Sequence, residues 1–248
     1  MAAQSRVEVE HIVVDACSTD GTVEYLKEQP HLRWISEPDS GMSEGINKGF
    51  QMATGDWVMW LNADDTLLDN ALKRVQDFAA INPEADVIYG GWRFVDKVGA
   101  PLKDMRLFPI DLGMLIYGGC YIGSTACFFR RATTIGEGFL LHQDFRQVMD
   151  LEYYLRLLKA GKRFTYLPEL LSTFRLHDEN SSMKDFHGRS LPQLVRQHRL
   201  WAETIALRRY YGWTPIPHPI FAPLFDCMTW SFYRFKRIVL KLIHRSYS

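Results

Sequence analysis

The stretch Trp57-Val58-Met59-Trp60-Leu61-Asn62-Ala63-Asp64-Asp65 joins five apolar residues to a polar cluster, and this change decides how the first hundred residues are interpreted. A short run of large apolar side chains is typical of a strand buried on both faces of a sheet. Carboxylates are costly to bury, so two of them after such a strand indicate a cation site or a solvated cleft. The alternative is that Asp64 or Asp65 caps a helix beginning at Thr66.

The same pattern of an apolar run closed by an acid occurs earlier, where Asp15 ends a β-branched run. Strands alternating with helical periodicity predict an α/β fold with a mostly parallel central sheet and flanking helices. Ligands of such sheets bind beyond the carboxyl ends of the strands, so Asp15 and Asp64 are expected on one edge. The predicted strands are His11–Val14, Leu32–Ser36, Trp57–Leu61, Val87–Tyr89 and Phe164–Leu167, and a further helix is predicted over Phe145–Lys159.

The composition is that of a globular protein: 47% of the 248 residues are hydrophobic and 23% are charged, which excludes intrinsic disorder. The formal net charge is zero, so no bulk field attracts nucleic acid, and we expect none as a partner. The charge is unevenly distributed. Residues 191–248 carry nine Lys or Arg and two acids, a balance of +7 that leaves −7 on the first 190 residues. We therefore expect an acidic body, 1–190, and a basic tail, 191–248.

The mixture of apolar and basic residues in the tail predicts a basic amphipathic helix from Met228 to about His244. Such helices bind anionic lipid surfaces. The alternative is a helix packed on the rest of the protein. No apolar run is long enough to span a bilayer. Four cysteines without a signal peptide or a C-x-x-C pair predict free thiols in a reducing compartment. The expected location is cytoplasmic, with peripheral contact to the inner face of the plasma membrane.

Four segments resemble the inverting family 2 glycosyltransferases, which have the GT-A, nucleotide-diphospho-sugar transferase fold. They span about 10–182 in the order and spacing of that family, and the second is most similar to bacterial enzymes that build O-antigen, capsule and exopolysaccharide. The segments are 13–22 (VVDACSTDGT), 36–65 (SEPDSGMSEGINKGFQMATGDWVMWLNADD), 149–161 (MDLEYYLRLLKAG) and 174–182 (FRLHDENSS).

The resemblance implies a donor site for a nucleotide-sugar, in particular a UDP-sugar, with Mn²⁺ or Mg²⁺ on the diphosphate. Asp15 matches the residue that contacts uridine, although Ala16 stands where many members have a second aspartate. The D-x-D motif of the family matches Asn62-Ala63-Asp64, so Asp64 is the expected metal ligand and Asn62 supplies no charge. Asp65 is expected on the donor side with them.

The resemblance also extends to residues further from this motif. His177 matches a histidine near the metal and diphosphate, and is the second expected metal ligand. Asp39 in the Glu-Pro-Asp loop, and Asn47 with Lys48 on the next helix, are expected to line the donor side. A solvated loop and an ordinary helix face are the alternatives for these three.

Asp150 matches the catalytic base of the family, which removes the proton of the acceptor hydroxyl as it attacks the anomeric carbon. The alternative is that Asp150 decorates an exposed helix face beside Glu152 and Arg156. Glu152 is the competing base, but a spacing of two residues points it to a different helix face. The implied acceptor is a saccharide or a lipid-linked saccharide in cell-surface polysaccharide synthesis.

Members of the family begin with a strand and helix of about thirty residues before the segment that matches Val13-Val14-Asp15. We expect this chain to lack them and its sheet to be short of a strand. That departure, with Asn62 and Ala16, motivates an alternative function: a catalytically inactive remnant that binds sugar nucleotides. A nicotinamide-dependent oxidoreductase is disfavoured because no G-x-G-x-x-G follows a strand.

Overall fold

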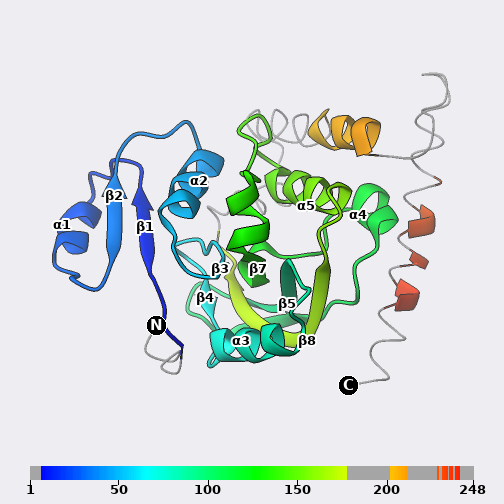
Figure 1. The fold of residues 1–248 in the computed structure, drawn as a ribbon, viewed down its shortest axis with the longest axis horizontal. Coiled ribbons are helices and arrows are strands. Elements are labelled where there is room, and N and C mark those ends of the chain that lie inside the picture. Colours follow the sequence, from blue (N-terminus) through cyan, green and yellow to red (C-terminus); the bar gives the residue numbers. More distant parts are fainter. Residues whose placement is uncertain are drawn as a thin grey trace.

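The structure, a computed structural model, describes residues 7–177, 202–211 and nine residues of the tail (228, 231–233, 235, 236 and 238–240). Within them the chain forms an α/β fold (Figure 1). The helices and strands are β1 (Ile12–Asp15), α1 (Thr22–Lys27), β2 (Arg33–Ser36), α2 (Met42–Met52), β3 (Trp57–Val58), β4 (Thr66–Leu67), α3 (Ala71–Ile81), β5 (Val87–Val95), β6 (Pro101–Met105), α4 (Leu112–Gly118), β7 (Cys127–Arg130), α5 (Met149–Lys159) and β8 (Phe164–Arg175).

The first two strands form a parallel sheet of their own, with Asp15 opposite Ser36. In Figure 1, β1, β2 and α1 lie to one side of the main sheet, with α2 next to β1. Helix α2 packs on β1 through Gly49, where an added Cβ would lie at an ordinary contact distance of 3.5 Å from a methyl group of Val14. Among the described residues β1 pairs with β2 alone. The expectation of a strand missing before residue 10 stays a prediction.

The main sheet is mixed. Its described strands follow the order β3-β7-β5-β8-β4, and β6 also pairs with β5. Of these pairings β5–β8 is parallel, whereas β3–β7, β5–β7, β5–β6 and β4–β8 are antiparallel. The prediction of a mostly parallel sheet is therefore wrong. The reason lies in residues 91–140, where the sequence pattern indicated no strand: the chain turns back as β6, and β7 later enters the sheet in the direction opposite to β5.

Strands β5 and β8 both run well beyond their predicted ends. The apolar pattern of β5 is interrupted at Gly90 and Gly91, so the sequence indicated a strand end there. In the structure these glycines instead let neighbouring chain approach closely: a Cβ on Gly90 would lie 2.8 Å from the Glu169 carbonyl oxygen, and one on Gly91 2.6 Å from that of Met105. The extension of β8 carries Arg175 and the two residues after it toward the loop that follows β3.

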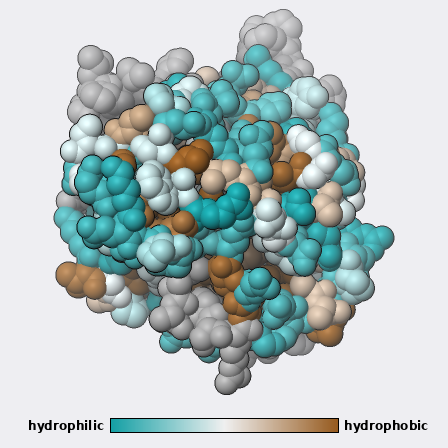
Figure 2. Space-filling model, turned by 60° about the vertical axis from the view of Figure 1, so that its left-hand side comes forward, coloured by the Kyte–Doolittle hydropathy of each residue, from teal (hydrophilic) through white to brown (hydrophobic). Residues whose placement is uncertain are grey.

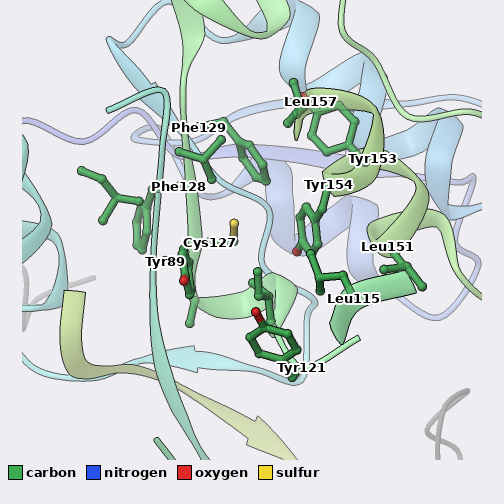
Figure 3. Packing of buried hydrophobic residues seen from close by; sticks show 14 of the residues in the cluster. Tyr89, Leu115, Tyr121, Cys127, Phe128, Phe129, Leu151, Tyr153, Tyr154 and Leu157 are labelled. Carbon is green, nitrogen blue, oxygen red and sulfur yellow. The ribbon is translucent and has the colours of Figure 1, made fainter. Parts of the chain in front are cut away.

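The predicted strand Trp57–Leu61 is shorter than expected, because the chain leaves the sheet after Val58. Trp60 then turns into an aromatic core, where its ring is stacked on Phe129 of β7 at 5.5 Å between centroids. Tyr153 and Tyr154 of α5 also pack against Phe129, and Figure 3 shows these three side chains together. The buried face of α5 therefore packs directly on the sheet and fixes the direction of the helix.

Residues 202–211 form a helix, and its Leu207 is 2% exposed and part of the core. The boundary predicted after residue 190 stays a prediction, but this described part of the second unit packs on the first. No helix among the described residues combines the length and the apolar character that crossing a membrane requires. The face in Figure 2 is largely hydrophilic, with hydrophobic side chains in small separate groups.

Candidate functional site

The loop after β3 is not the start of a helix. Thr66 and Leu67 form β4, which pairs with β8, and α3 begins only at Ala71. The alternative in which Asp64 or Asp65 caps a helix beginning at Thr66 is therefore wrong. Both carboxylates belong to a turn between two strands, and their positions are fixed by contacts other than helix capping.

Asp65 is the buried anchor of this turn. Its side chain is 5% exposed, and it accepts hydrogen bonds from the Arg175 N–H at 2.9 Å and from the Asn62 amide at 3.0 Å. Burial raises the pKa of the Asp65 carboxyl. An ionised aspartate at position 62 could not donate the second bond, which gives a structural reason for asparagine where the family has the first aspartate of its motif.

Asp64 and His177, the two predicted metal ligands, lie together although 113 residues separate them. Asp64 Oδ2 is 2.7 Å from His177 Nε2, and the side chains are 32% and 28% exposed. Arg175 contributes to this arrangement, because its Nε donates to the Asp64 carbonyl oxygen at 3.0 Å. His177 was predicted from the sequence and Arg175 was not. The one feature of the sequence that could have indicated Arg175 is its position two residues before the histidine.

A carboxylate and an imidazole next to each other form a donor set that suits Mn²⁺, and a carboxylate alone suits Mg²⁺. The described residues contain no group of three or more His, Cys, Asp and Glu side chains arranged to hold a metal. A divalent ion at Asp64 and His177 would thus need further ligands from phosphate oxygens and water, which is how Mg²⁺ is commonly held in nucleotide sites. The residues fit a metal that binds together with its nucleotide.

Asp15 ends β1 as a buried carboxylate with defined partners. It accepts hydrogen bonds from the Ser18 N–H at 3.0 Å and from the Ser36 hydroxyl at 2.6 Å. Hydrogen bonding by the side chains of Ser18 and Ser36 lowers the pKa of the Asp15 carboxyl, so it is ionised at neutral pH. The turn that places Ser18 passes through Cys17, whose φ of 63° is in the left-handed region. The contact of Asp15 with a nucleotide base stays a prediction.

The other residues predicted on the donor side are engaged within the protein. Asp39 accepts from the Gly41 N–H at 2.9 Å. The Asn47 amide exchanges two hydrogen bonds of 2.8 Å with the backbone of Leu141. Lys48 donates to the Pro38 carbonyl and pairs with two neighbouring glutamates, and the bond to Glu37 raises its pKa. These contacts brace the Glu-Pro-Asp loop and do not test a donor contact.

Asp150 lies in the first turn of α5 and is partly buried. Its Oδ1 accepts the Leu151 N–H at 2.8 Å, while burial raises the pKa of the carboxyl. The start of α5 also touches α2, because the Ser43 hydroxyl lies 3.2 Å from the Met149 sulfur. The predicted base is thus held next to the helix that follows the Glu-Pro-Asp loop.

Glu152 is not the exposed carboxylate that the sequence suggested. It is 2% exposed, pairs with Arg156 at 2.9 Å and accepts from the Tyr211 hydroxyl at 3.0 Å. Arg156 is itself only partly exposed and also donates to the Leu140 carbonyl. Glu152 is therefore a structural residue, which leaves Asp150 as the carboxylate available at the start of this helix.

One residue of this region was missed altogether. Glu203, in the helix 202–211, is 8% exposed and accepts hydrogen bonds from the backbone of residues 146–148, directly before α5. No motif surrounds it, and it lies in the segment assigned to the tail. Only the three-dimensional arrangement reveals this contact.

The chain is thus an α/β protein with carboxylates at the end of β1 and after β3 and a partly exposed carboxylate at the start of α5. Residues 1–139 match the family model described as glycosyl transferase family 2. Because that match covers more than half of the 248 residues, the chain belongs to glycosyl transferase family 2, and the expected resemblance is confirmed.

A curated relative gives a finer comparison. The putative teichuronic acid biosynthesis glycosyltransferase TuaG of Bacillus subtilis (strain 168) is 28% identical over 186 residues, which cover 72% of each protein. The chain spans from 26% to 72% of the length of the first curated relatives that it matches.

Solved structures are similar at the level of the fold. Staphylococcus aureus TarS 1–349 in complex with UDP-GlcNAc has a TM-score of 0.58 at 16% identity, over 94% of this chain and 73% of that one. The mannosyltransferase PcManGT from Pyrobaculum calidifontis, in complex with GDP-Man and Mn²⁺, has a TM-score of 0.53 at 16% identity, over 97% and 80%. Both show that the fold is GT-A-like.

Proposed function

We propose that the protein is an inverting, metal-dependent glycosyltransferase that moves a sugar from a UDP-sugar to a saccharide or lipid-linked saccharide in cell-surface polysaccharide synthesis. The observation that carries the proposal is the contact of 2.7 Å between Asp64, which matches the D-x-D motif of family 2, and His177, because a carboxylate and an imidazole together suit a divalent metal. The names of TuaG, a putative teichuronic acid enzyme, and of TarS with bound UDP-GlcNAc support the acceptor class and the nucleotide.

In the proposed reaction the acceptor oxygen forms a bond to the anomeric carbon on the side opposite the diphosphate. The bond from that carbon to the diphosphate breaks, and its electron pair leaves with UDP. Asp150 takes the proton of the acceptor hydroxyl. Asp64 and His177 would hold Mn²⁺ or Mg²⁺, which stabilises the negative charge on the departing diphosphate. Asp15 would contact the uridine, and Asp65 with Arg175 keeps the Asp64 loop in place.

The experiment is a thermal-shift panel of UDP-GlcNAc, UDP-glucose and GDP-mannose, each with Mn²⁺ and with EDTA, followed by assays of UDP release. We expect a UDP-sugar to raise the Tm with Mn²⁺ and to be turned over. Stabilisation by GDP-mannose alone would overturn the nucleotide assignment. Metal-dependent binding without release of UDP or transfer of sugar would instead support the inactive, sugar-nucleotide-binding remnant.

A pH profile tests the role of Asp150. Because burial raises its pKa, the carboxyl stays protonated to a higher pH than an ordinary aspartate, whose pKa is about 3.9. The titratable neighbours that interact with it, Cys127 of β7 and Tyr154, also have pKa values raised by burial, so both are neutral across this range. We expect kcat to fall on the acidic side through a pKa clearly above 3.9. A flat profile down to pH 4 would contradict this assignment.

We propose further that the tail binds an anionic membrane surface, with one helix face docked and the other free. On the docked face Tyr233 stacks on Tyr117 of α4 at 5.5 Å, and Lys236 pairs with Asp111 at 2.5 Å. The Tyr233 ring lies close over Gly113, because a Cβ added there would be 2.7 Å from a ring carbon, so a larger residue at 113 would displace this ring. The helix-packing alternative thus describes one face of the tail.

The opposite face of the tail presents apolar side chains to solvent at intervals of three or four residues. Met228, Phe232, Phe235 and Ile238 are 52% to 66% exposed. An exposed apolar row on a segment with net charge +7 is complementary to anionic lipid, which offers both an apolar interior and negative headgroups. A cytoplasmic enzyme with a lipid-linked acceptor would meet that substrate at such a surface.

The membrane contact predicts that the protein co-floats with phosphatidylglycerol vesicles and much less with phosphatidylcholine vesicles. Phe232→Glu combined with Phe235→Glu should weaken flotation at least about tenfold, because burying one such side chain is worth about 1.5–3 kcal/mol. Leu102→Glu on β6, also an exposed apolar position, is the matched control and should leave flotation unchanged. Unchanged flotation of the double variant, or a concentration-dependent dimer that it abolishes, would contradict lipid as the occupant.

A further inference from the structure

Helix α5, which follows the turn at 146–148, has no side-chain cap from its own N-cap residue. The N-cap position is Val148, which makes no side-chain hydrogen bond to the helix, and valine is a poor N-cap residue. Instead the Glu203 carboxylate accepts the N–H of Gln147 at 2.8 Å, of Arg146 at 3.2 Å and of Val148 at 3.3 Å. Three successive N–H groups on one carboxylate form an anion-binding nest, and the negative charge lies at the positive end of α5.

This turn is also where the Glu-Pro-Asp loop region meets the helix that carries Asp150. The Arg146 guanidinium donates to the Ser40 carbonyl oxygen at 3.3 Å, and the Ser43 hydroxyl contacts the Met149 sulfur at 3.2 Å. The position of the turn therefore sets how the start of α5 sits against α2. A displacement here would move Asp150 relative to the predicted donor side.

The remaining contacts of the helix 202–211 fix it on both α4 and α5. Arg208 donates to the Ile116 and Tyr117 carbonyl oxygens at the end of α4, at 3.1 and 3.2 Å. Tyr211 donates to Glu152, one turn further along α5. Glu203 is thus presented by a helix that is anchored independently at two other points.

We propose that Glu203 is a positioning residue for the catalytic base: its carboxylate fixes the turn at 146–148 and thereby the direction of Asp150. This inference rests on the proposed function, in which Asp150 is the base. It gives the helix 202–211 a role in the chemistry of the site although it contributes no group that touches substrate.

The test compares Glu203→Ala and Glu203→Gln with Arg208→Ala, which removes a different anchor of the same helix. In Glu203→Ala we expect amide hydrogen exchange at residues 146–148 to accelerate at least about tenfold, by loss of a cap. We expect kcat to fall about 10- to 100-fold through misplacement of the base, with the donor KM unchanged. The acidic limb of kcat should move to lower pH, because a frayed first turn returns Asp150 to water.

Glu203→Gln keeps one acceptor oxygen and should lie between the wild type and Glu203→Ala. Arg208→Ala should lower the Tm without moving the acidic limb or slowing transfer by the folded protein. If both alanine variants lose activity only in proportion to the fraction unfolded, or if exchange at 146–148 is unchanged, Glu203 has no positioning role. If Asp150→Asn proves active, the assignment of the base fails and the positioning role fails with it. The exchange measurement needs no turnover, so it still shows separately whether Glu203 holds the turn at 146–148.

Discussion

Replacing Asp150 by asparagine is expected to lower kcat for sugar transfer by about 10²- to 10⁴-fold, the usual contribution of a general base. Donor affinity should stay unchanged, because the base acts only as the acceptor hydroxyl attacks. The fold should be retained, since asparagine has nearly the same shape and its side-chain oxygen can still accept the Leu151 N–H. Single-turnover transfer, with the donor Kd from titration, measures the two effects separately.

Asp144→Asn is the matched control for this variant, because Asp144 is an exposed carboxylate six residues earlier in the same segment. It should transfer sugar at the rate of the wild type. Glu152→Gln should lower the Tm by disturbing the buried contacts with Arg156 and Tyr211, with little loss of kcat in the folded fraction. A near-normal rate for Asp150→Asn together with an inactive but folded Glu152→Gln would show that the base was misassigned.

The elements that could be predicted from the sequence are those whose signal is local. The apolar run before Asp15, the helix expected to carry Asn47 and Lys48 and the apolar stripe along α5 each depend on a pattern within a dozen residues, and the structure has a strand or helix at each place. The polar residues from Asn62 to Asp65 were predicted to follow a strand for the same reason, and they do lie in the loop after β3, although that strand already ends at Val58.

What could not be predicted depends on contacts between distant residues. Strand β4 exists because Thr66 and Leu67 meet β8 more than a hundred residues later, so local patterning suggested a helix there instead. Asp65 is anchored by Arg175, and the start of α5 by Glu203, and no periodicity links such pairs. The acidic body and basic tail of the charge distribution likewise gave no indication that one tail glutamate belongs to the body.

The resemblance to a family identified more candidate site residues than the hydrophobic pattern did. In the structure these residues have different roles. Of the two neighbouring aspartates after β3, one is buried and holds the loop, and the other is accessible beside His177. Asn47 and Lys48 are engaged with backbone or neighbouring acids. The candidate residues therefore separate into partly exposed side chains, such as Asp64, and side chains whose contacts hold the surrounding loops in place.

Replacing Asp64 by asparagine should remove the Mn²⁺-dependent stabilisation by UDP while leaving the metal-free Tm close to that of the wild type. Loss of a group that only hydrogen-bonds to a metal ligand costs metal sites about 10- to 100-fold in affinity, so loss of a charged ligand itself should cost at least about 100-fold. A ligand at 100 times its Kd stabilises a protein by about 2.7 kcal/mol, and a 100-fold weaker one would lose most of that stabilisation. His177→Gln should have a smaller effect, since a neutral ligand is lost and the carboxylate remains.

The control for the metal variants is Asp69→Asn, because Asp69 is an exposed carboxylate in the short connection between β4 and α3. It should bind UDP with Mn²⁺ as the wild type does. The competing explanation is that the 2.7 Å contact between Asp64 and His177 is only a hydrogen bond that joins the β3 loop to the end of β8. In that case both variants would lower the Tm of the metal-free protein, and the increment produced by Mn²⁺ and UDP would survive in each. A metal ligand affects stability only when the metal is bound, whereas a structural hydrogen bond affects it in the absence of metal as well. The two explanations therefore differ in whether the variants lower the Tm of the metal-free protein or only the Tm measured with Mn²⁺ and UDP.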